Sequence, residues 1–329
     1  MLVTSLLICL AQSAPAAEVS KIITPGQYLT IPSVDLYGRR PFQPDVIYRD
    51  HIWKADAKPP EAGEAELGER GEEQFWVAAE ANENGGLGGG LGYAYTSLEM
   101  KQREVRFAKL AGAWTLYVNG RAYFGDAYRF GFGGVPVVLE KGLNHIFVTG
   151  IRGGFSLQFV ESDKGVVHGG WDDTVPHLVR GEWTRGAVGI ELSNLQDVPT
   201  GPIKLEWEGP GIKSSFRYYG GLLGLAANQF AFPLSALVMG EEATIPLQVR
   251  VTGPGIEGLS LATHLEFTLD LQVREPSQKR VRTYLSSVDN SAQEYAIVPP
   301  SKSDGGGKPE WMGLVLSLHG AGVTSWGQA

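Results

Sequence analysis

The chain has 329 residues, a formal net charge of −8, 44 glycines, 19 prolines and a single cysteine. Its apolar fraction of 43% is ordinary for a folded soluble protein. The length predicts two or three domains with substantial cores. The acidic balance argues against a nucleic-acid or anionic-membrane partner, because both are bound through basic patches. Many glycines and prolines between short apolar runs favour turn-rich β structure.

Residues 1–17 have the pattern of a signal peptide. Leu2–Ala11 is apolar but too short to cross a bilayer, and Ala-Pro-Ala-Ala at 14–17 supplies small residues for cleavage. The usual basic n-region is missing, so a lipoprotein signal at Cys9 and a buried N-terminal strand are the alternatives. We expect a secreted or periplasmic protein. Its mature chain would then lack cysteine, and with it any disulfide or cysteine-type zinc site.

Two strand-like runs and a tight turn give a strong β signal in the front half of the chain. Val105–Leu110 and Trp114–Val118 alternate apolar and polar residues, which is typical of strands with one buried face. Asn119 and Gly120 follow, and both residue types readily take the positive φ of a type I′ turn. The sequence therefore predicts an antiparallel hairpin at this turn.

The turn is part of a longer pattern within residues 75–160 that resembles a galactose-binding-type jelly roll. The pattern is Val-Asn-Gly, then Gly-Asp-x-Tyr, then Pro-Val-x-Leu-x-Lys-Gly-x-Asn-x-Ile-x-Val. The resemblance implies a jelly-roll β-sandwich over residues 18–165, of a kind found beside the catalytic domains of secreted hydrolases. Such modules are either structural or bind sugars through exposed aromatic rings, and the sequence leaves both alternatives open.

A polar joint and a second β series come next. Within the joint, His168, Asp173 and His177 lie close in sequence, but their spacing matches neither a His-Glu-x-x-His motif nor an EF-hand. We therefore expect no metal site and no cofactor. Strand-like runs separated by proline and glycine turns recur up to Val273. Their spacing predicts a second, immunoglobulin-like β-sandwich over residues 166–275.

Residues 276–329 begin with a predicted hairpin and continue into an apolar strand. Val281–Leu285 and Gln293–Val298 alternate, and two prolines end the pairing. Gly313–Leu318 is an apolar run typical of a strand buried on both faces. The residues directly after this strand are His319, Gly320, Ala321 and Gly322. Glycines there would let backbone N–H groups approach a developing oxyanion.

This arrangement resembles the start of the catalytic domain in prolyl-oligopeptidase-like and esterase-like α/β-hydrolases. The resemblance implies that residues 319–322 form the oxyanion-hole loop, with His319 shaping the loop rather than acting as the general base. In that family the nucleophile, the acid and the base follow this loop, and here the sequence ends at Ala329. We therefore expect 276–329 to be the incomplete beginning of an α/β-hydrolase domain, with no catalytic triad.

Together these observations predict a mainly β chain with two β-sandwich domains and the first elements of an α/β-hydrolase. By the resemblance, the chain is the N-terminal portion of an exported serine hydrolase, an esterase or a peptidase. Its partner would be the ester or peptide substrate of the full-length enzyme, and the chain alone would be inactive. The alternative is a non-catalytic carbohydrate-binding or adhesion protein. Neither hypothesis involves nucleic acid or membrane.

Overall fold

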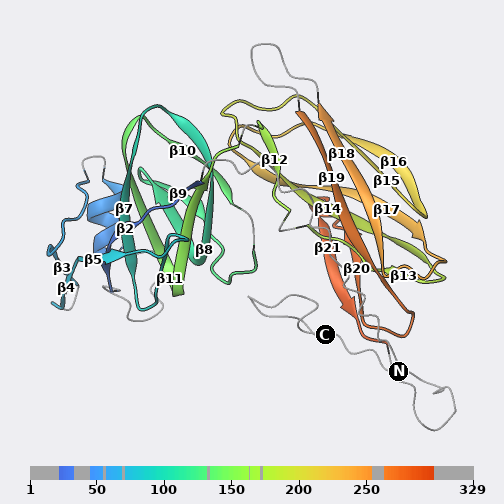
Figure 1. The fold of residues 1–329 in the computed structure, drawn as a ribbon, viewed down its shortest axis with the longest axis horizontal. Coiled ribbons are helices and arrows are strands. Elements are labelled where there is room, and N and C mark those ends of the chain that lie inside the picture. The colour runs from blue at the N-terminus through green and yellow to red at the C-terminus, as the bar shows by residue number, and fades with distance from the viewer. Residues whose placement is uncertain are drawn as a thin grey trace, which may run out of the picture.

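The structure is a computed structural model, and it describes residues 22–32, 45–54, 57–68, 71–131, 134–162, 164–170, 173–253 and 263–299. Within these ranges the chain is mainly β, and its helical element is the π-helix η1 (Tyr48–Trp53). The strands form two units that lie beside each other, an arrangement consistent with β-sandwich domains (Figure 1). The predicted mainly β fold class is confirmed.

The first unit is built on a nine-stranded antiparallel sheet. Its strands are β1 (Ile22–Ile23), β2 (Gln27–Ile31), β5 (Val77–Glu80), β6 (Gly86–Leu87), β7 (Tyr93–Met100), β8 (Glu104–Val118), β9 (Arg121–Phe124), β10 (Val135–Leu139) and β11 (Gly142–Val160). The main order is β10-β8-β11-β7-β2-β5, with β1 and β6 paired to β11 and β9 paired to β8. A separate pair, β3 (Ala65–Leu67) and β4 (Glu73–Phe75), lies on the same side as η1 (Figure 1).

The two longest strands of this unit, β8 and β11, each contain an irregular point, and β8 continues through the break that the sequence predicts between Leu110 and Trp114. Strand β8 passes through Gly112, whose φ is +83° and whose N–H donates to the carbonyl of Asp126. The register between β8 and β11 shifts between Ile151 and Ser156. Such a bulge bends a strand without ending it, so β8 and β11 curve around the core.

The predicted hairpin at Asn119 and Gly120 is present between β8 and β9, and both residues have positive φ, 50° and 79°. The Lys-Gly-x-Asn part of the pattern lies where β10 ends and β11 begins, and the buried side chain of Asn144 holds this turn. Its amide nitrogen donates to the carbonyls of Leu98, Glu140 and Gly142, and its oxygen accepts from Asn119 Nδ2 and the Glu140 N–H. This network explains why asparagine stands at this place in the pattern.

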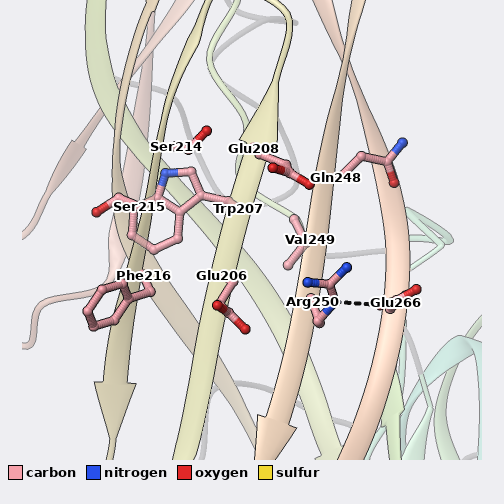
Figure 2. Close-up of a pocket in the computed structure, with 10 residues that line it drawn as sticks. All are labelled: Glu206, Trp207, Glu208, Ser214, Ser215, Phe216, Gln248, Val249, Arg250 and Glu266. Carbon is pink, nitrogen blue, oxygen red and sulfur yellow. Dashed lines mark hydrogen bonds and ion pairs between the residues drawn. The ribbon is translucent and has the colours of Figure 1, made fainter.

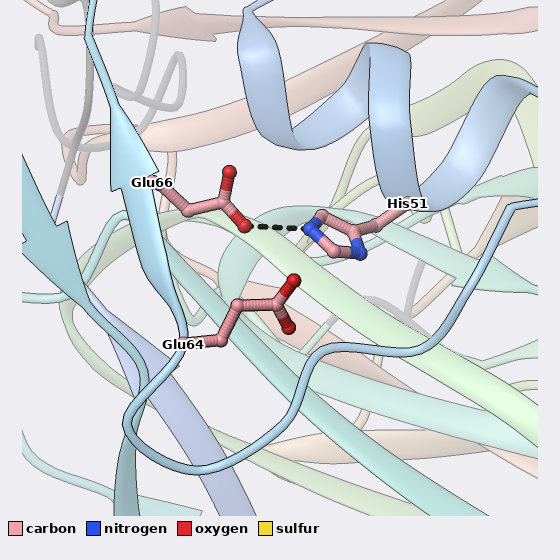
Figure 3. Close-up of side chains that lie close together, drawn as sticks. All are labelled: His51, Glu64 and Glu66. Carbon is pink, nitrogen blue, oxygen red and sulfur yellow. Dashed lines mark hydrogen bonds and ion pairs between the residues drawn. The ribbon is translucent and has the colours of Figure 1, made fainter.

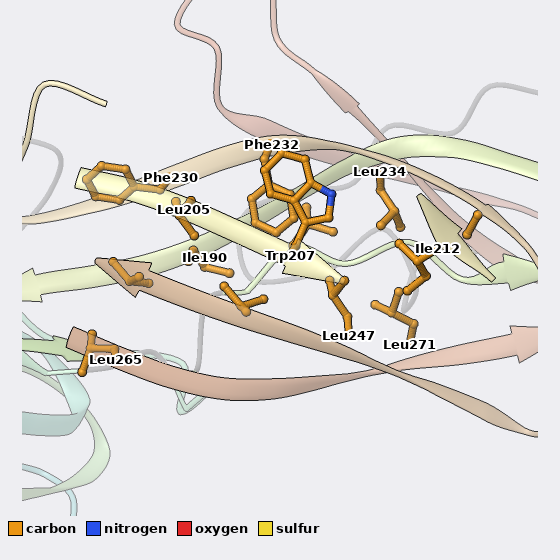
Figure 4. Packing of buried hydrophobic residues seen from close by; sticks show 14 of the residues in the cluster. Ile190, Leu205, Trp207, Ile212, Phe230, Phe232, Leu234, Leu247, Leu265 and Leu271 are labelled. Atoms are coloured by element: carbon orange, nitrogen blue, oxygen red, sulfur yellow. The ribbon is translucent and has the colours of Figure 1, made fainter. Parts of the chain in front are cut away.

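The second unit is one sheet that folds over a single core. Its strands are β12 (Val166–His168), β13 (Leu178–Val179), β14 (Trp183–Asn194), β15 (Ile203–Gly209), β16 (Ile212–Tyr219), β17 (Ala227–Leu237), β18 (Thr244–Gly253) and β19 (Thr263–Arg274). The order is β12-β14-β17-β16-β15-β18-β19-β13. Strands β16 and β17 share one register pair, Ile212 opposite Ala236, where the sheet turns over. Trp207 and Phe232 then stack across the core with ring centroids 4.5 Å apart (Figure 4).

The predicted hairpin near the C-terminus is also present, as β20 (Arg280–Leu285) and β21 (Ala292–Ile297). In the described chain it is a separate two-stranded sheet, and it packs against β14 of the second unit. Added Cβ atoms at Gly186 and Gly189 would lie 2.7 Å from Thr283 Oγ1 and 2.9 Å from Ala292 Cβ. The hairpin therefore docks where β14 carries glycine, and its assignment to the start of an α/β-hydrolase domain is not supported.

An ion pair joins the two units. Arg103, in the turn between β7 and β8, places Nη1 3.0 Å from Asp197 Oδ2 of the second unit. Both side chains are about half exposed, and an exposed pair of this kind contributes about 0–1 kcal/mol. The pair marks the contact between the units without accounting for its stability.

Candidate functional site

Four neighbouring strands of the second unit, β16, β15, β18 and β19, present an exposed sheet surface, called the outer face below. Side chains alternate between the two faces of a strand. On β15, Leu205 and Trp207 enter the core, whereas Lys204, Glu206 and Glu208 lie on the opposite face. The same alternation on the other three strands gives the outer face its composition.

The strand register aligns the outer-face residues in rows across the sheet. One row reads Phe216, Glu206, Arg250 and Glu266. The next row reads Tyr218, Lys204, Thr252 and His264. A third contains Glu208, Gln248 and Thr268. Each of the first two rows therefore starts with an aromatic ring on β16 and continues with polar or charged groups.

The two aromatic rings of the outer face are open to solvent. Phe216 is 56% exposed and Tyr218 is 66% exposed. Their ring centroids are 5.7 Å apart and the ring planes make an angle of 77°. Adjacent exposed rings rimmed by polar groups are a common feature of ligand-binding surfaces.

Charged side chains surround these rings and pair with one another. Lys204 Nζ lies 2.7 Å from Glu206 Oε1 and 5.1 Å from the Phe216 ring centroid. Arg250 Nε donates to Glu266 Oε1 at 2.5 Å. This hydrogen bond and the charge of Arg250 lower the pKa of Glu266, so its carboxylate is ionised at neutral pH.

A cleft of about 550 Å³ lies over the outer face (Figure 2). Its lining includes Phe216, Glu206, Glu208, Gln248 and Arg250. A second hollow of about 460 Å³ lies over the row of Tyr218, Lys204 and Thr252. These volumes are in the range of small-molecule sites, which is about 300–1,000 Å³.

The first unit has a cleft of about 430 Å³ between η1 and the β8–β9 turn. Trp53 on its rim is 65% exposed. The polar groups that line it are largely used inside the protein, because Lys54 pairs with Asp50 and both ends of the Asn119 amide are hydrogen-bonded. This cleft therefore offers a ligand fewer hydrogen-bonding groups than the outer face does.

His51, Glu64 and Glu66 gather beside η1 (Figure 3), with one donor atom from each within 4.8 Å of the others. His51 Nδ1 lies 2.6 Å from the carbonyl oxygen of Lys58, and Nε2 lies 2.6 Å from Glu66 Oε1. Trp76 Nε1 donates to the same carboxylate oxygen at 2.9 Å. The side chains of His51 and Glu66 are buried, whereas Glu64 is exposed.

Opposing effects set the protonation of this group. Burial lowers the pKa of His51, but the hydrogen bonds with Glu66 and the Lys58 carbonyl raise it by more. Burial raises the pKa of Glu66, but the hydrogen bonds from His51 and Trp76 lower it by more. The pair therefore favours a cation beside a carboxylate. An imidazole and two carboxylates are also a donor set that transition metals use.

The predicted oxyanion-hole residues His319, Gly320, Ala321 and Gly322 lie outside the described residues. The histidines of the polar joint have structural partners. His168 Nε2 lies 2.9 Å from Asp173 Oδ2, and its ring stacks on Phe267 at 3.8 Å. His177 contacts the β20–β21 hairpin instead. Among the described residues, no helix has the length and apolar character needed to span a membrane.

Reasoning from the sequence missed the outer face because strand β16 was not predicted. A usable signal exists at Pro210-Gly211, a turn dipeptide directly between β15 and β16. Pairing the chain across that turn would have predicted β16 as the partner of β15, but it would have placed Ser215 opposite Glu206, because the register shifts by one residue between Trp207 and Gly209.

Comparison with known proteins gives matches among solved structures alone. No family model matches the sequence, and no curated protein matches it. The exo-chitosanase of Amycolatopsis orientalis matches with a TM-score of 0.35 and 12% identity, over 84% of this chain and 36% of that one. β-Glucuronidase 2 of Bacteroides uniformis matches with a TM-score of 0.34 and 8% identity, over 86% of this chain and 35% of that one. The β-D-mannosidase of Dictyoglomus thermophilum matches with a TM-score of 0.32 and 10% identity, over 84% of this chain and 38% of that one.

The chain therefore spans little more than a third of the length of these glycoside hydrolases. At such TM-scores and identities the likeness assigns neither a function nor a site to this chain. The matches do contradict the predicted resemblance to prolyl-oligopeptidase-like and esterase-like α/β-hydrolases. The interpretation as the N-terminal portion of an exported serine hydrolase, esterase or peptidase is wrong.

The physical reason for the error is the low information content of the motif. A strand followed by His-Gly-Ala-Gly is a short local pattern, and the hairpin before it is a general β element that docks on the second unit. The ester and peptide substrates that followed from the resemblance are likewise unsupported. The alternative hypothesis, a non-catalytic carbohydrate-binding or adhesion protein, does not depend on this motif.

Proposed function

We propose that this chain binds carbohydrate through the outer face of its second unit and does so without catalysis. The observation that carries the proposal is the pair of exposed rings, Phe216 and Tyr218, each at the start of a row of polar groups. A sugar ring has apolar C–H faces that pack on aromatic rings, and hydroxyl groups that pair with carboxylates, amides and guanidinium groups. The outer face offers both kinds of contact.

The polar groups of the outer face retain hydrogen-bonding capacity for a ligand. Arg250 uses Nε for Glu266, and its terminal nitrogens make no hydrogen bond within the described chain. Gln248 accepts from Thr268 Oγ1 at 2.9 Å through its oxygen, which leaves its amide protons available. Glu208 is exposed on the same face and supplies a carboxylate acceptor. These donors and acceptors can satisfy several hydroxyl groups at once.

The charge of the outer face selects among glycans. Within the cleft, the acidic side chains Glu206, Glu208 and Glu266 outnumber the basic side chain Arg250. Lys204 adds one positive charge in the next row. A surface with this balance repels uronate and sulfated sugars. The ligand that suits it is a neutral or amino-bearing glycan.

The carboxylate of Glu266 is unsuited to glycoside cleavage. Glycoside hydrolysis uses a carboxyl group held protonated by a raised pKa, with a second carboxyl group close by. The pKa of Glu266 is lowered by Arg250, which is the opposite of what a general acid requires. The face is also open to solvent, so it does not exclude water from a bound glycan.

The proposal includes the finer organisation of the chain. We assign residues 18–165 to a jelly-roll sandwich and residues 166–275 to an immunoglobulin-like sandwich, with the β20–β21 hairpin attached to the second. The antiparallel pairing within the first unit and the folded-over sheet of the second support this assignment. We also propose export after removal of residues 1–17, because the apolar run and the small residues at 14–17 suit a signal peptidase.

Affinity gel electrophoresis tests the proposed function. The full chain is run through gels that contain neutral β-glucan, galactomannan or xylan, and chitosan and polygalacturonate represent charged glycans. We expect retardation by at least one neutral or amino-bearing polysaccharide and none by polygalacturonate. The double variant Phe216→Ala/Tyr218→Ala should lose at least about tenfold in affinity, because each stacked ring contributes on the order of 1 kcal/mol.

Trp53→Ala is the matched control, because Trp53 is an equally exposed ring on the first unit. It should leave retardation unchanged. The proposal fails if none of the polysaccharides retards the chain, or if the double variant is retarded as strongly as the parent.

A further inference from the structure

We infer that His51, Glu64 and Glu66 form a zinc-binding site in the first unit. This site is separate from the outer face and does not depend on carbohydrate binding. His51 comes from η1, Glu66 from strand β3, and Glu64 from the residue directly before β3. They supply one imidazole nitrogen and two carboxylates, with the donor atoms within 4.8 Å of one another.

The histidine is oriented as a metal ligand. His51 Nδ1 lies 2.6 Å from the Lys58 carbonyl oxygen, so Nδ1 carries a proton and donates it. The remaining nitrogen, Nε2, faces Glu66 Oε1 at 2.6 Å. A lone pair on each atom would repel at this distance, so a positive species must lie between them. A proton fulfils this role in a hydrogen bond. A metal ion would also fulfil it if the two atoms moved slightly further apart.

The surrounding groups match the outer contacts of metal sites. A ligating histidine usually donates its other N–H to a carbonyl or carboxylate, and a ligating carboxylate usually accepts a further hydrogen bond. Here the Lys58 carbonyl fills the first role, and Trp76 Nε1, 2.9 Å from Glu66 Oε1, fills the second. Glu66 is only 6% exposed, yet its other oxygen makes no hydrogen bond in the described chain. That oxygen is available to a metal.

The donor set selects zinc over calcium and magnesium. Calcium and magnesium prefer sites made of oxygen ligands, six or more for calcium. Zinc accepts mixed nitrogen and oxygen ligands in a four-coordinate site, at about 2.0–2.2 Å. Tetrahedral placement would put Nε2 and Oε1 about 3.3 Å apart, so the two atoms need to separate by less than 1 Å from their present distance. Three protein ligands would leave one position for water.

Charge and access also favour an ion at this place. The two carboxylates of Glu64 and Glu66 carry two negative charges. A proton on His51 cancels one of them, whereas a divalent cation that replaces this proton cancels both. The nearby basic side chains of Arg49 and Lys54 are both paired with Asp50. They are therefore not used to neutralise Glu64 and Glu66. Glu64 is exposed and His51 also lines the cleft next to Trp53, so an ion can enter from solvent.

Titration calorimetry with zinc chloride on the untagged, chelator-treated full chain tests this inference. We expect one zinc ion per chain and a higher thermal midpoint with zinc than without it. Glu64→Gln should weaken zinc binding by at least about tenfold. Because Glu64 is exposed and the glutamine oxygen can still accept the hydrogen bond from the Glu61 N–H, this variant keeps the local fold.

The control is Glu73→Gln, which removes an exposed carboxylate from the neighbouring strand β4. It should bind zinc like the parent. Absence of zinc binding in the parent would show that a proton alone bridges His51 and Glu66, and would overturn the inference. Equal zinc affinity in the Glu64→Gln and Glu73→Gln variants would place the ion elsewhere on the surface and would also overturn it.

Discussion

His177 Nδ1 accepts a hydrogen bond from the backbone N–H of Val281 at 3.2 Å, and the backbone N–H of His177 donates to the Val281 carbonyl at 3.1 Å. Arg274 Nε approaches the same ring nitrogen at 3.4 Å. Burial and, to a smaller extent, the charge of Arg274 lower the pKa of His177 from 6.5 to about 4. A neutral imidazole therefore ties the β20–β21 hairpin to the second unit.

This contact predicts a loss of stability in mild acid. The unfolded chain binds a proton at His177 below about pH 6.5 and the folded chain below about pH 4, so stability should fall as the pH drops through that window. The ring is about half buried, so the loss after solvent screening is about 1 kcal/mol. Urea unfolding at pH 7 and pH 4.5 measures it.

His177→Asn is the informative variant, because its side-chain oxygen can accept the Val281 hydrogen bond but does not titrate in this range. Its stability should change less between the two pH values than that of the parent. An equal change in parent and variant would assign the acid sensitivity to other groups.

The hydrogen bonds of Thr283 lead to a prediction about how strongly the β20–β21 hairpin is attached to β14. Its hydroxyl accepts from the Ala187 N–H at 2.9 Å and donates to the Ala187 carbonyl at 2.6 Å, in a buried position. Thr283→Val keeps the volume but leaves both backbone groups unpaired, which should cost about 2 kcal/mol. Amide hydrogen exchange should then show faster exchange in β20 and β21. The control is Thr268→Val, on the exposed outer face, whose β20 and β21 amides should exchange at the same rate as in the parent. A similar increase in exchange rate in both variants would refute the role of Thr283.

The hydrogen bonds of Asn144 should contribute substantially to the stability of the first unit. Its amide donates to three carbonyl groups, so the nearly isosteric Asn144→Asp would aim carboxylate oxygens at carbonyl oxygens. We expect a loss on the order of 3 kcal/mol at pH 7, and a smaller loss at low pH, where the new carboxyl group is protonated. Thermal unfolding is the readout. The exposed Asn228→Asp is the control and should change stability by less than about 0.5 kcal/mol. A destabilisation by Asn144→Asp no larger than the control's would show that the network is not important for folding.

Local signals predicted the turns of this fold well. Asn119-Gly120 gave the β8–β9 hairpin because its two residue types suit the positive φ that the turn needs. The alternation in residues 281–298 gave the β20–β21 hairpin for a similar reason. Gly112 misled the same reasoning, because a glycine in a strand can mark either an end or a bulge, and here β8 continues through it.

The candidate sites depend on contacts that lie far apart in sequence. Glu206 and Glu266 reach the same row of the outer face through the pairing of three strands, and a sequence pattern does not contain that register. His51 and Glu66 meet because η1 packs beside β3. The His319–Gly322 motif was given too much weight, since a glycine turn after a strand fits many folds.

A crystal structure of the full chain with an oligosaccharide from the polysaccharide that retards it most would test the central claim most directly. The account predicts a sugar ring stacked on Phe216 or Tyr218, with hydroxyl groups hydrogen-bonded to Glu206, Gln248 or Arg250. Sugar density confined to the Trp53 cleft or to the loops at the ends of the units, with the outer face empty, would contradict it.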